Sequence, residues 1–426
     1  MPSFFAKPQQ MLRPLISDVA GRTSPRLARL LPSRRSPDLD SLCKRVMLPS
    51  LPVADEDMTR IAIWEKGRRM VRQDHWDDLS RRVQLADDAR LSTPGGLPEA
   101  TLLVLGAHGD VVAAATDALH DGIPPEPRAM GALEEVLEDA PDDYVRALVV
   151  GLAHLRIGRA WLEVGDASGV VGATGAMHHA SAHADKARAV LAPFDPVDLD
   201  APSLATAQAA LSEGPPPPDT TDPQVTAYRA LITLDPDCPQ HMRDYGSLLS
   251  RANSGEAGLL EHEAGHIAGI TRSVWDDSGY AWVYLDALAC EPSALLGLDS
   301  DRFIKGLKSL VTLRPNQHLI NEITALCAIK MAPGTAHPKA AERTRAALHG
   351  CLDWLLTNHL HELHPRLWAG SEIHDCLSTP RLGHRALVAM GRKRALHCIA
   401  TVFADDMADG SSIAFSPAGM YRLPAI

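Results

Sequence analysis

Four consecutive prolines begin at Pro215, near the middle of this 426-residue chain, inside the segment SEGPPPPDTTDP at 212–223. Proline lacks an amide hydrogen and clashes with the preceding helical turn, so a run of prolines excludes helix and favours an extended polyproline spacer. The chain is also longer than one ordinary hydrophobic core requires. We therefore expect a linker at 214–223 between an N-terminal helical domain at 51–213 and a C-terminal helical domain at 224–426.

The composition favours helices over sheets. Apolar residues make up 45% of the chain but aromatic residues only 4%. Alanine and leucine are abundant and runs of β-branched residues are rare, which is typical of helical proteins. Apolar residues recur at helical spacing, as in Ile61, Trp64 and Val71, and the breaker STPGGLP precedes a predicted long helix from about Glu99 to Leu119. The predicted fold class is all-α.

The apolar runs and the cysteines suggest a cellular location. No apolar run approaches the roughly 18 to 20 residues that span a bilayer, so we expect no transmembrane segment. The seven cysteines are scattered, odd in number and without a C-x-x-C pair. This pattern favours reduced thiols over a disulfide framework. We therefore expect a soluble protein in the cytoplasm.

Charge is distributed unevenly along the chain. Residues 1–50 carry a net charge of +6, which leaves −17 on the remainder because the whole chain carries −11. We expect residues 1–50 to form a disordered basic arm, and such an arm could touch anionic surfaces such as phosphate or lipid headgroups. The acidic remainder argues against a nucleic-acid groove, so no nucleic-acid partner is expected.

A helix–proline–helix pattern recurs three times. Pro141, Pro236 and Pro315 each stand between two helical patterns, where proline forces the chain to leave the first helix. A small residue stands ten positions after each proline, at Gly151, Gly246 and Ala325. Small side chains there would let two antiparallel helices approach closely.

The segment YRALITLDPDCPQHMRDYGSLL resembles the tetratricopeptide repeat (TPR) in its Leu-Asp-Pro junction and its later glycine. The three prolines lie 95 and 79 residues apart, whereas a tandem array repeats about every 34 residues. The resemblance implies TPR-like helical hairpins in an α-solenoid, with a concave groove for a peptide or a protein partner. It places Arg243, Tyr245 and Asn321 near that groove and implies no catalytic residue and no cofactor.

The string His262-Glu263-Ala264-Gly265-His266 matches H-E-x-x-H. On a helix the two histidines lie one turn apart on the same face and can bind one Zn²⁺, while the glutamate acts as general base on zinc-bound water. HEAGH resembles the motif of membrane-bound AAA-type zinc proteases over about ten residues. That resemblance implies a zinc-dependent hydrolase with His262 and His266 as ligands and Glu263 as catalytic base.

The sequence leaves the third zinc ligand open. Glu291 is preferred and Asp286 is the alternative, because both follow at plausible distances. The competing interpretation is an ordinary amphipathic helix that packs Leu260, Ala264 and Ile267 inward. Because the proline junctions recur three times and the zinc motif stands alone, we favour a helical-repeat interaction protein over a zinc hydrolase.

Overall fold

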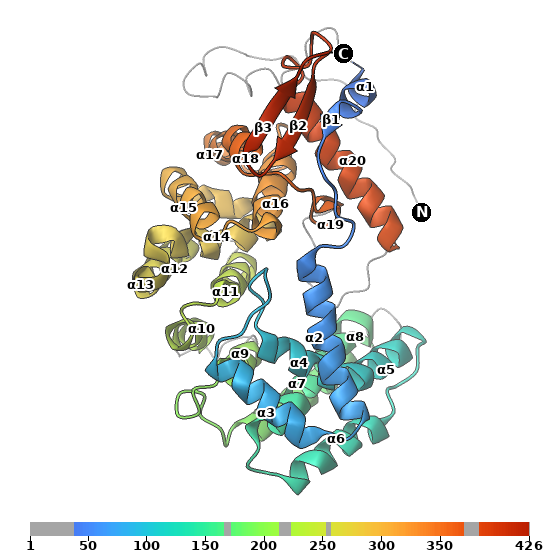
Figure 1. The fold of residues 1–426 in the computed structure, drawn as a ribbon. Helices are drawn as coiled ribbons and strands as arrows, with labels where there is room; N and C mark the ends of the chain where they lie inside the picture. Colours follow the sequence, from blue (N-terminus) through green and yellow to red (C-terminus); the bar gives the residue numbers. More distant parts are fainter. Residues whose placement is uncertain (1–37, 166–171, 213–222, 253–256, 370–382, 426) are drawn as a thin grey trace, which may run out of the picture.

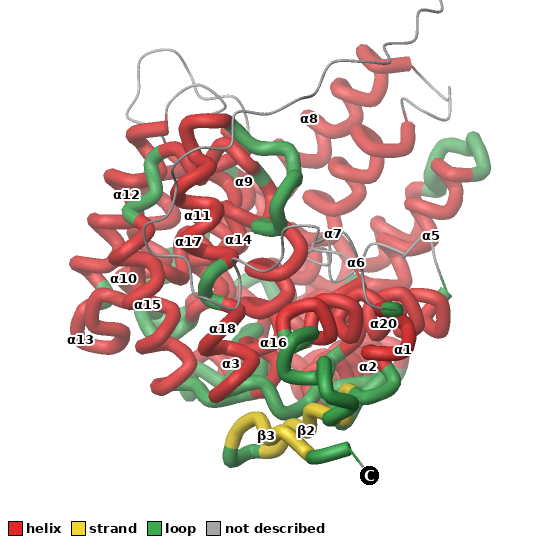
Figure 2. The backbone as a smooth tube through the Cα atoms, turned by 90° about the horizontal axis from the view of Figure 1, so that it is seen from above, coloured by secondary structure: helices red, strands yellow, loops and turns green. Residues whose placement is uncertain are grey.

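The computed structural model describes residues 38–165, 172–212, 223–252, 257–369 and 383–425. The chain is 72% helix with three short strands, which confirms the predicted all-α class. Figure 1 shows α3 to α9 in the lower part of the molecule, with α10 beside α9 and the helices from α11 to α20 above. Figure 2 shows the two longer strands at one edge of the helical body.

The N-terminal group of helices covers the described residues between 55 and 211. Its elements are α2 (Asp55–Arg72), α3 (Trp76–Asp88), α4 (Glu99–Ala107), α5 (Gly109–His120), α6 (Pro127–Asp139), α7 (Tyr144–Ala160), a π-helical turn (Trp161–Gly165), α8 (Gly172–Leu191) and α9 (Pro202–Leu211). The side chain of Asp143 caps α7 by accepting a hydrogen bond from the Val145 amide at 2.9 Å.

The C-terminal group of helices begins at Pro223, the last residue of the proline-rich segment. Its α-helices are α10 (Pro223–Leu234), α11 (Pro239–Ala252), α12 (Ala257–Ile270), α13 (Arg272–Trp275), α14 (Gly279–Cys290), α15 (Ser300–Leu313), α16 (Gln317–Ala325), α17 (Glu342–His349), α18 (Leu352–Asn358), α19 (Pro365–Ala369) and α20 (His384–Val402). Shorter helical turns are Asp276–Ser278, Pro292–Leu296, Leu326–Lys330 and Lys339–Ala341. Residues 213–222 of the predicted linker lie outside the described residues.

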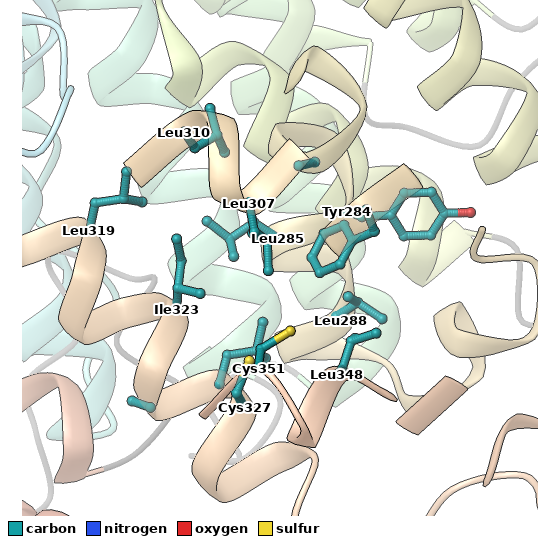
Figure 3. Close-up of a cluster of buried hydrophobic side chains, with 14 of the residues drawn as sticks. Tyr284, Leu285, Leu288, Leu307, Leu310, Leu319, Ile323, Cys327, Leu348 and Cys351 are labelled. Carbon is teal, nitrogen blue, oxygen red and sulfur yellow. The ribbon is translucent and has the colours of Figure 1, made fainter. Parts of the chain in front are cut away.

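In the described part of the chain the buried apolar side chains form two clusters. One draws on residues between 76 and 207, and the other on residues between 225 and 415 together with Leu42, Val46, Ala205 and Ala209. Figure 3 shows part of the second cluster, where leucines of α14 and α15 meet Leu319 and Ile323 of α16. Because α9 contributes to both clusters, the two groups of helices are packed against each other rather than merely tethered.

The predicted disordered arm is too long, because residues 38–50 belong to the fold. Helix α1 (Leu39–Cys43) packs on α20, and β1 (Val46–Met47) pairs in parallel with β2 (Ser412–Ser416). β2 in turn pairs antiparallel with β3 (Gly419–Leu423), giving a sheet of order β1-β2-β3. Leu42 and Val46 are buried in the larger cluster. Residues 1–37 lie outside the described residues.

Each of the three prolines lies between two helices, as predicted: Pro141 between α6 and α7, Pro236 between α10 and α11, and Pro315 between α15 and α16. At Gly246 a helix outside the hairpin makes the close approach. A Cβ at Gly246 would lie 1.8 Å from the carbonyl oxygen of Val283, which belongs to α14 and not to the hairpin partner α10. The glycine therefore permits contact between neighbouring hairpins.

The predicted long helix from Glu99 to Leu119 is wrong, because α4 and α5 meet at a 57° bend. His108 separates the two helices, and a Cβ at Gly109 would lie 2.8 Å from the Trp64 ring. Among the described residues no single helix has the length and apolar character to cross a membrane, whereas this bent pair meets both criteria when its helices are taken together.

Candidate functional site

A pocket opens where the two groups of helices meet. It encloses about 710 Å³ of space that includes open solvent. Five segments supply its walls: the start of α2, the α3–α4 loop, the first turn of α11, one face of α16, and the start of α19. The lining residues are Leu51, Pro52, Ala54, Glu56, Asp57, Arg60, Gly95, Leu97, Gln240, Arg243, His318, Glu322, His364, Arg366 and Leu367.

Glu56 fixes the α3–α4 loop against the start of α2. Its carboxylate accepts hydrogen bonds from the Thr93 hydroxyl at 2.8 Å and from the Gly95 amide at 2.5 Å. A Cβ at Gly95 would lie 2.7 Å from the carboxyl carbon of Glu56, so only glycine allows this approach. Glu56 is 3% exposed, and a buried carboxylate needs such donors to avoid a large desolvation cost.

Arg243 forms a buried ionic network behind the pocket. Its guanidinium donates to Asp286 of α14 at 2.8 and 3.0 Å and to Glu322 of α16 at 3.1 and 3.2 Å. Burial raises the pKa of Glu322, but the nearby Arg243 and His318 together hold that pKa below its ordinary value. The network therefore keeps charges in place and joins α11, α14 and α16.

The mouth of the pocket carries partly exposed charges of both signs. Asp57 pairs with Arg366 at 2.7 Å and with Arg60 at 3.5 Å. On the facing helix α16, His318 lies 3.8 Å from Glu322. Between 14% and 20% of each of these five side chains is exposed. A ligand in the pocket would therefore meet alternating positive and negative groups whose positions are already set.

Several buried polar atoms around the pocket have no hydrogen-bond partner within the described chain: Nδ1 of His318, Nδ1 of His364 and Nε of Arg366. The other ring nitrogen of His364 lies 2.8 Å from the Glu362 carboxylate. Burial lowers the pKa of His364, which favours the neutral ring at neutral pH. Buried polar atoms without partners are costly, so water or a ligand bound nearby would stabilise this region.

The three residues predicted to lie near a groove occupy different places. Arg243 lines the pocket, whereas the Tyr245 hydroxyl donates to Glu263 at 2.8 Å. Asn321 is fully buried and holds the loop before α19. Its amide nitrogen donates to the Glu362 carbonyl at 2.8 Å, and its oxygen accepts from the His364 amide at 3.0 Å. Asn321 thus positions the segment that brings His364 and Arg366 to the pocket.

The HEAGH string lies in α12, as predicted for a helix. His262 and His266 are both exposed, and the side chain of His262 is 72% exposed. Glu263 points inward at 1% exposure, where Arg229 donates to its carboxylate at 2.9 Å and Tyr245 at 2.8 Å. Glu291 lies at the C-terminal end of α14. Zinc binding by this set stays a prediction.

The surroundings of Glu263 determine its protonation. Burial raises the pKa of this carboxyl, but the hydrogen bonds from Arg229 and Tyr245 outweigh burial and leave the pKa below its ordinary value. A carboxylate in this state is a weak proton acceptor and a good structural partner. Its contacts join α10, α11 and α12 on the side of α11 away from Arg243.

Glu263→Gln is expected to lower the free energy of unfolding by about 1–3 kcal/mol at pH 7, because it weakens a buried, charge-assisted contact. The folded-state pKa lies below the unfolded one, so this stabilisation is present above the unfolded pKa and is lost as pH falls through the folded pKa. The difference between wild type and variant should shrink below about pH 4. Urea unfolding measures this difference in stability, and His262→Gln, a substitution of an exposed residue, serves as the control. Equal stability of Glu263→Gln and wild type at pH 7 would exclude this structural role.

Among the described residues, one group of three side chains brings its metal-binding atoms within 4.8 Å of one another: Asp235, Cys238 and His241. His262, His266 and Glu291 are not brought together in this way. Sequence reasoning passed over the group although the spacing D-x-x-C-x-x-H, in LDPDCPQH, was visible at the second proline junction. The pocket residues Arg60, His318 and Arg366 carry no local sequence signal.

Searches of protein-family models, of curated proteins and of solved structures found no match to this chain. The candidate site therefore rests on its own geometry.

Proposed function

We propose that this protein is a helical scaffold that binds a short polar segment of a protein partner in the pocket between its two groups of helices. The observation that carries the proposal is the alternation of charge at the pocket mouth, where Asp57, Arg60, Arg366, His318 and Glu322 are partly exposed and held by their neighbours. Such a surface suits a peptide that bears both acidic and basic side chains.

A further feature supports binding over chemistry at this pocket. Its charged side chains are paired with one another, as in a preformed recognition surface, so binding would require little rearrangement. The proposal includes a TPR-like relation between the α10–α11 and α15–α16 hairpins, and a cytoplasmic location in which the free thiols stay reduced.

The test uses the tagged full-length protein to recover partners from cells, followed by calorimetry with the recovered partner. Arg60→Ala/His318→Ala is expected to weaken binding at least tenfold, or about 1.4 kcal/mol. This double variant should keep its fold, because both side chains make only partly exposed ionic contacts.

Arg128→Ala serves as the matched control, since this arginine on α6 is 92% exposed and lies outside the pocket. It should bind the partner as the wild type does. Equal affinity of the double variant and the control for every recovered partner would refute the proposed site, and recovery of no partner would contradict the scaffold function.

A further inference from the structure

Asp235, Cys238 and His241 lie within one short junction between α10 and α11. Asp235 follows the last residue of α10, Pro236 ends that helix, and Cys238 directly precedes α11, which carries His241 in its first turn. All three side chains are buried, with 5%, 8% and 2% of their surfaces exposed. The turn forced by proline therefore brings a carboxylate, a thiol and an imidazole together inside the protein.

The distances fit a transition-metal ion. One donor atom from each residue lies within 4.8 Å of the other two, and Nε2 of His241 lies 3.3 Å from Oδ2 of Asp235. Tetrahedral Zn²⁺ binds imidazole nitrogen and carboxylate oxygen at about 2.0–2.2 Å, which separates those two atoms by about 3.3–3.5 Å. Small side-chain rotations would bring all three donors to one ion.

The donor types select the class of metal. A thiolate and an imidazole suit Zn²⁺ and its spectroscopic substitute Co²⁺, whereas Ca²⁺ and Mg²⁺ prefer sites made of oxygen. We propose that Asp235, Cys238 and His241 form a binding site for a zinc-class divalent cation. This site is independent of the partner-binding pocket and separate from the HEAGH string.

The neighbours of the three residues leave room for a metal. Oδ1 of Asp235 is buried and has no hydrogen-bond partner among the described residues; Arg90 is its nearest ionic neighbour at 3.8 Å. The Cys238 thiol makes a long contact, 3.9 Å, to the Gly96 carbonyl oxygen and lies within hydrogen-bonding reach of the His241 ring. A bound cation would compensate the buried carboxylate, whose burial is otherwise costly.

A second hollow adjoins this group and gives access to it. It encloses about 450 Å³, including open solvent, and its wall contains Asp235 and Cys238 together with Asp87, Arg90, Asp237 and Arg314. Three protein ligands with a fourth position open to solvent is the arrangement of exchangeable zinc sites. The two arginines of the wall favour water, hydroxide or a small anion as the fourth ligand.

The experiment titrates metal-free, full-length protein with Co²⁺ and Zn²⁺. We expect stoichiometric binding of Co²⁺ with a thiolate-to-cobalt charge-transfer band in the near ultraviolet, which only a cysteine ligand produces. Zn²⁺ should abolish the band and raise the melting temperature by mass action. Cys238→Ser and His241→Ala should each weaken Zn²⁺ binding by at least about a hundredfold, since loss of even an outer-shell contact costs 10- to 100-fold.

Two control variants separate this site from the alternatives. Cys290→Ser, at the end of α14, and His262→Ala/His266→Ala should bind both metals as the wild type does. No charge-transfer band in the wild type, or a band that persists in Cys238→Ser, would overturn the proposal. Loss of metal binding in the His262→Ala/His266→Ala variant alone would show that the metal binds at the HEAGH string instead.

A measurement on the wild-type protein tests the site without relying on variants that could misfold. Zn²⁺ should protect Cys238 from thiol alkylation, as followed by peptide mass spectrometry, while leaving alkylation of Cys43 and Cys290 unchanged. Equal alkylation of Cys238 with and without Zn²⁺ would count against the site.

Discussion

Arg243→Met is expected to lower the free energy of unfolding by about 3–5 kcal/mol at pH 7, because it removes the arginine that pairs with the buried carboxylate of Asp286 and the partly buried carboxylate of Glu322. Arg243 is 5% exposed and donates two hydrogen bonds each to Asp286 and Glu322. Methionine fills a similar volume, so the loss measures the charge rather than a cavity. Urea unfolding gives the value, and Arg128→Met, on the surface of α6, should be close to neutral.

The stability of Arg243→Met should also change with pH, and in an unusual direction. In the wild type the Glu322 pKa lies below its ordinary value, so the charged network is intact from neutral pH to below pH 5. Without Arg243 the buried carboxylates gain protons more readily in the folded than in the unfolded state. The stability of Arg243→Met should therefore rise as pH falls from 8 to about 5. A difference from wild type that stays constant across this range would contradict the network.

Gly246→Ala is expected to destabilise the protein by about 1–3 kcal/mol. We expect a value at the upper end of this range, because the clashing atom belongs to the backbone and cannot move aside as easily as a side chain can. The added methyl group would lie 1.8 Å from the Val283 carbonyl oxygen and would force α11 away from α14. Thermal or urea unfolding measures the effect.

The matched control for Gly246→Ala is expected to raise the stability of the protein. In Gly131→Ala the new Cβ, on α6, meets no atom within 4 Å, so the variant should gain about 0.5–1 kcal/mol from reduced backbone freedom. Destabilisation by both substitutions to a similar extent would show that helix packing is not the cause.

The helical class and the three proline junctions were predictable because they depend on local chemistry. Proline cannot continue a helix beyond its first turn, so Pro141, Pro236 and Pro315 indicated helical junctions without any knowledge of tertiary packing. The bend at His108 was missed because it depends on the Trp64 ring, which packs beside Gly109 from another helix. The strand Ser412–Ser416 was missed although its residues alternate between partly buried and buried, because so short a strand carries little signal.

The candidate pocket could not be predicted, since its walls come from segments between residues 51 and 367. Arg60, His318 and Arg366 are ordinary surface residues by sequence, and only packing brings them to one opening. Arg243 was named from a repeat resemblance, and its ion pairs with Asp286 and Glu322 were not foreseen. By contrast, Asp235, Cys238 and His241 are close in sequence, so a search for D-x-x-C-x-x-H at a helix start would have found them.

The sheet that joins the two ends of the described chain has a consequence for biosynthesis. Arg45 donates to the Met407 carbonyl oxygen, 362 residues further along the chain, at 2.7 Å, and among the described strands β1 pairs with β2 alone. A ribosome adding about 5–20 residues per second needs roughly 20–70 s to supply that partner. Throughout that time Leu42 and Val46 lack their final neighbours, and the nascent protein depends on chaperones or on its own N-terminal group of helices to shield them.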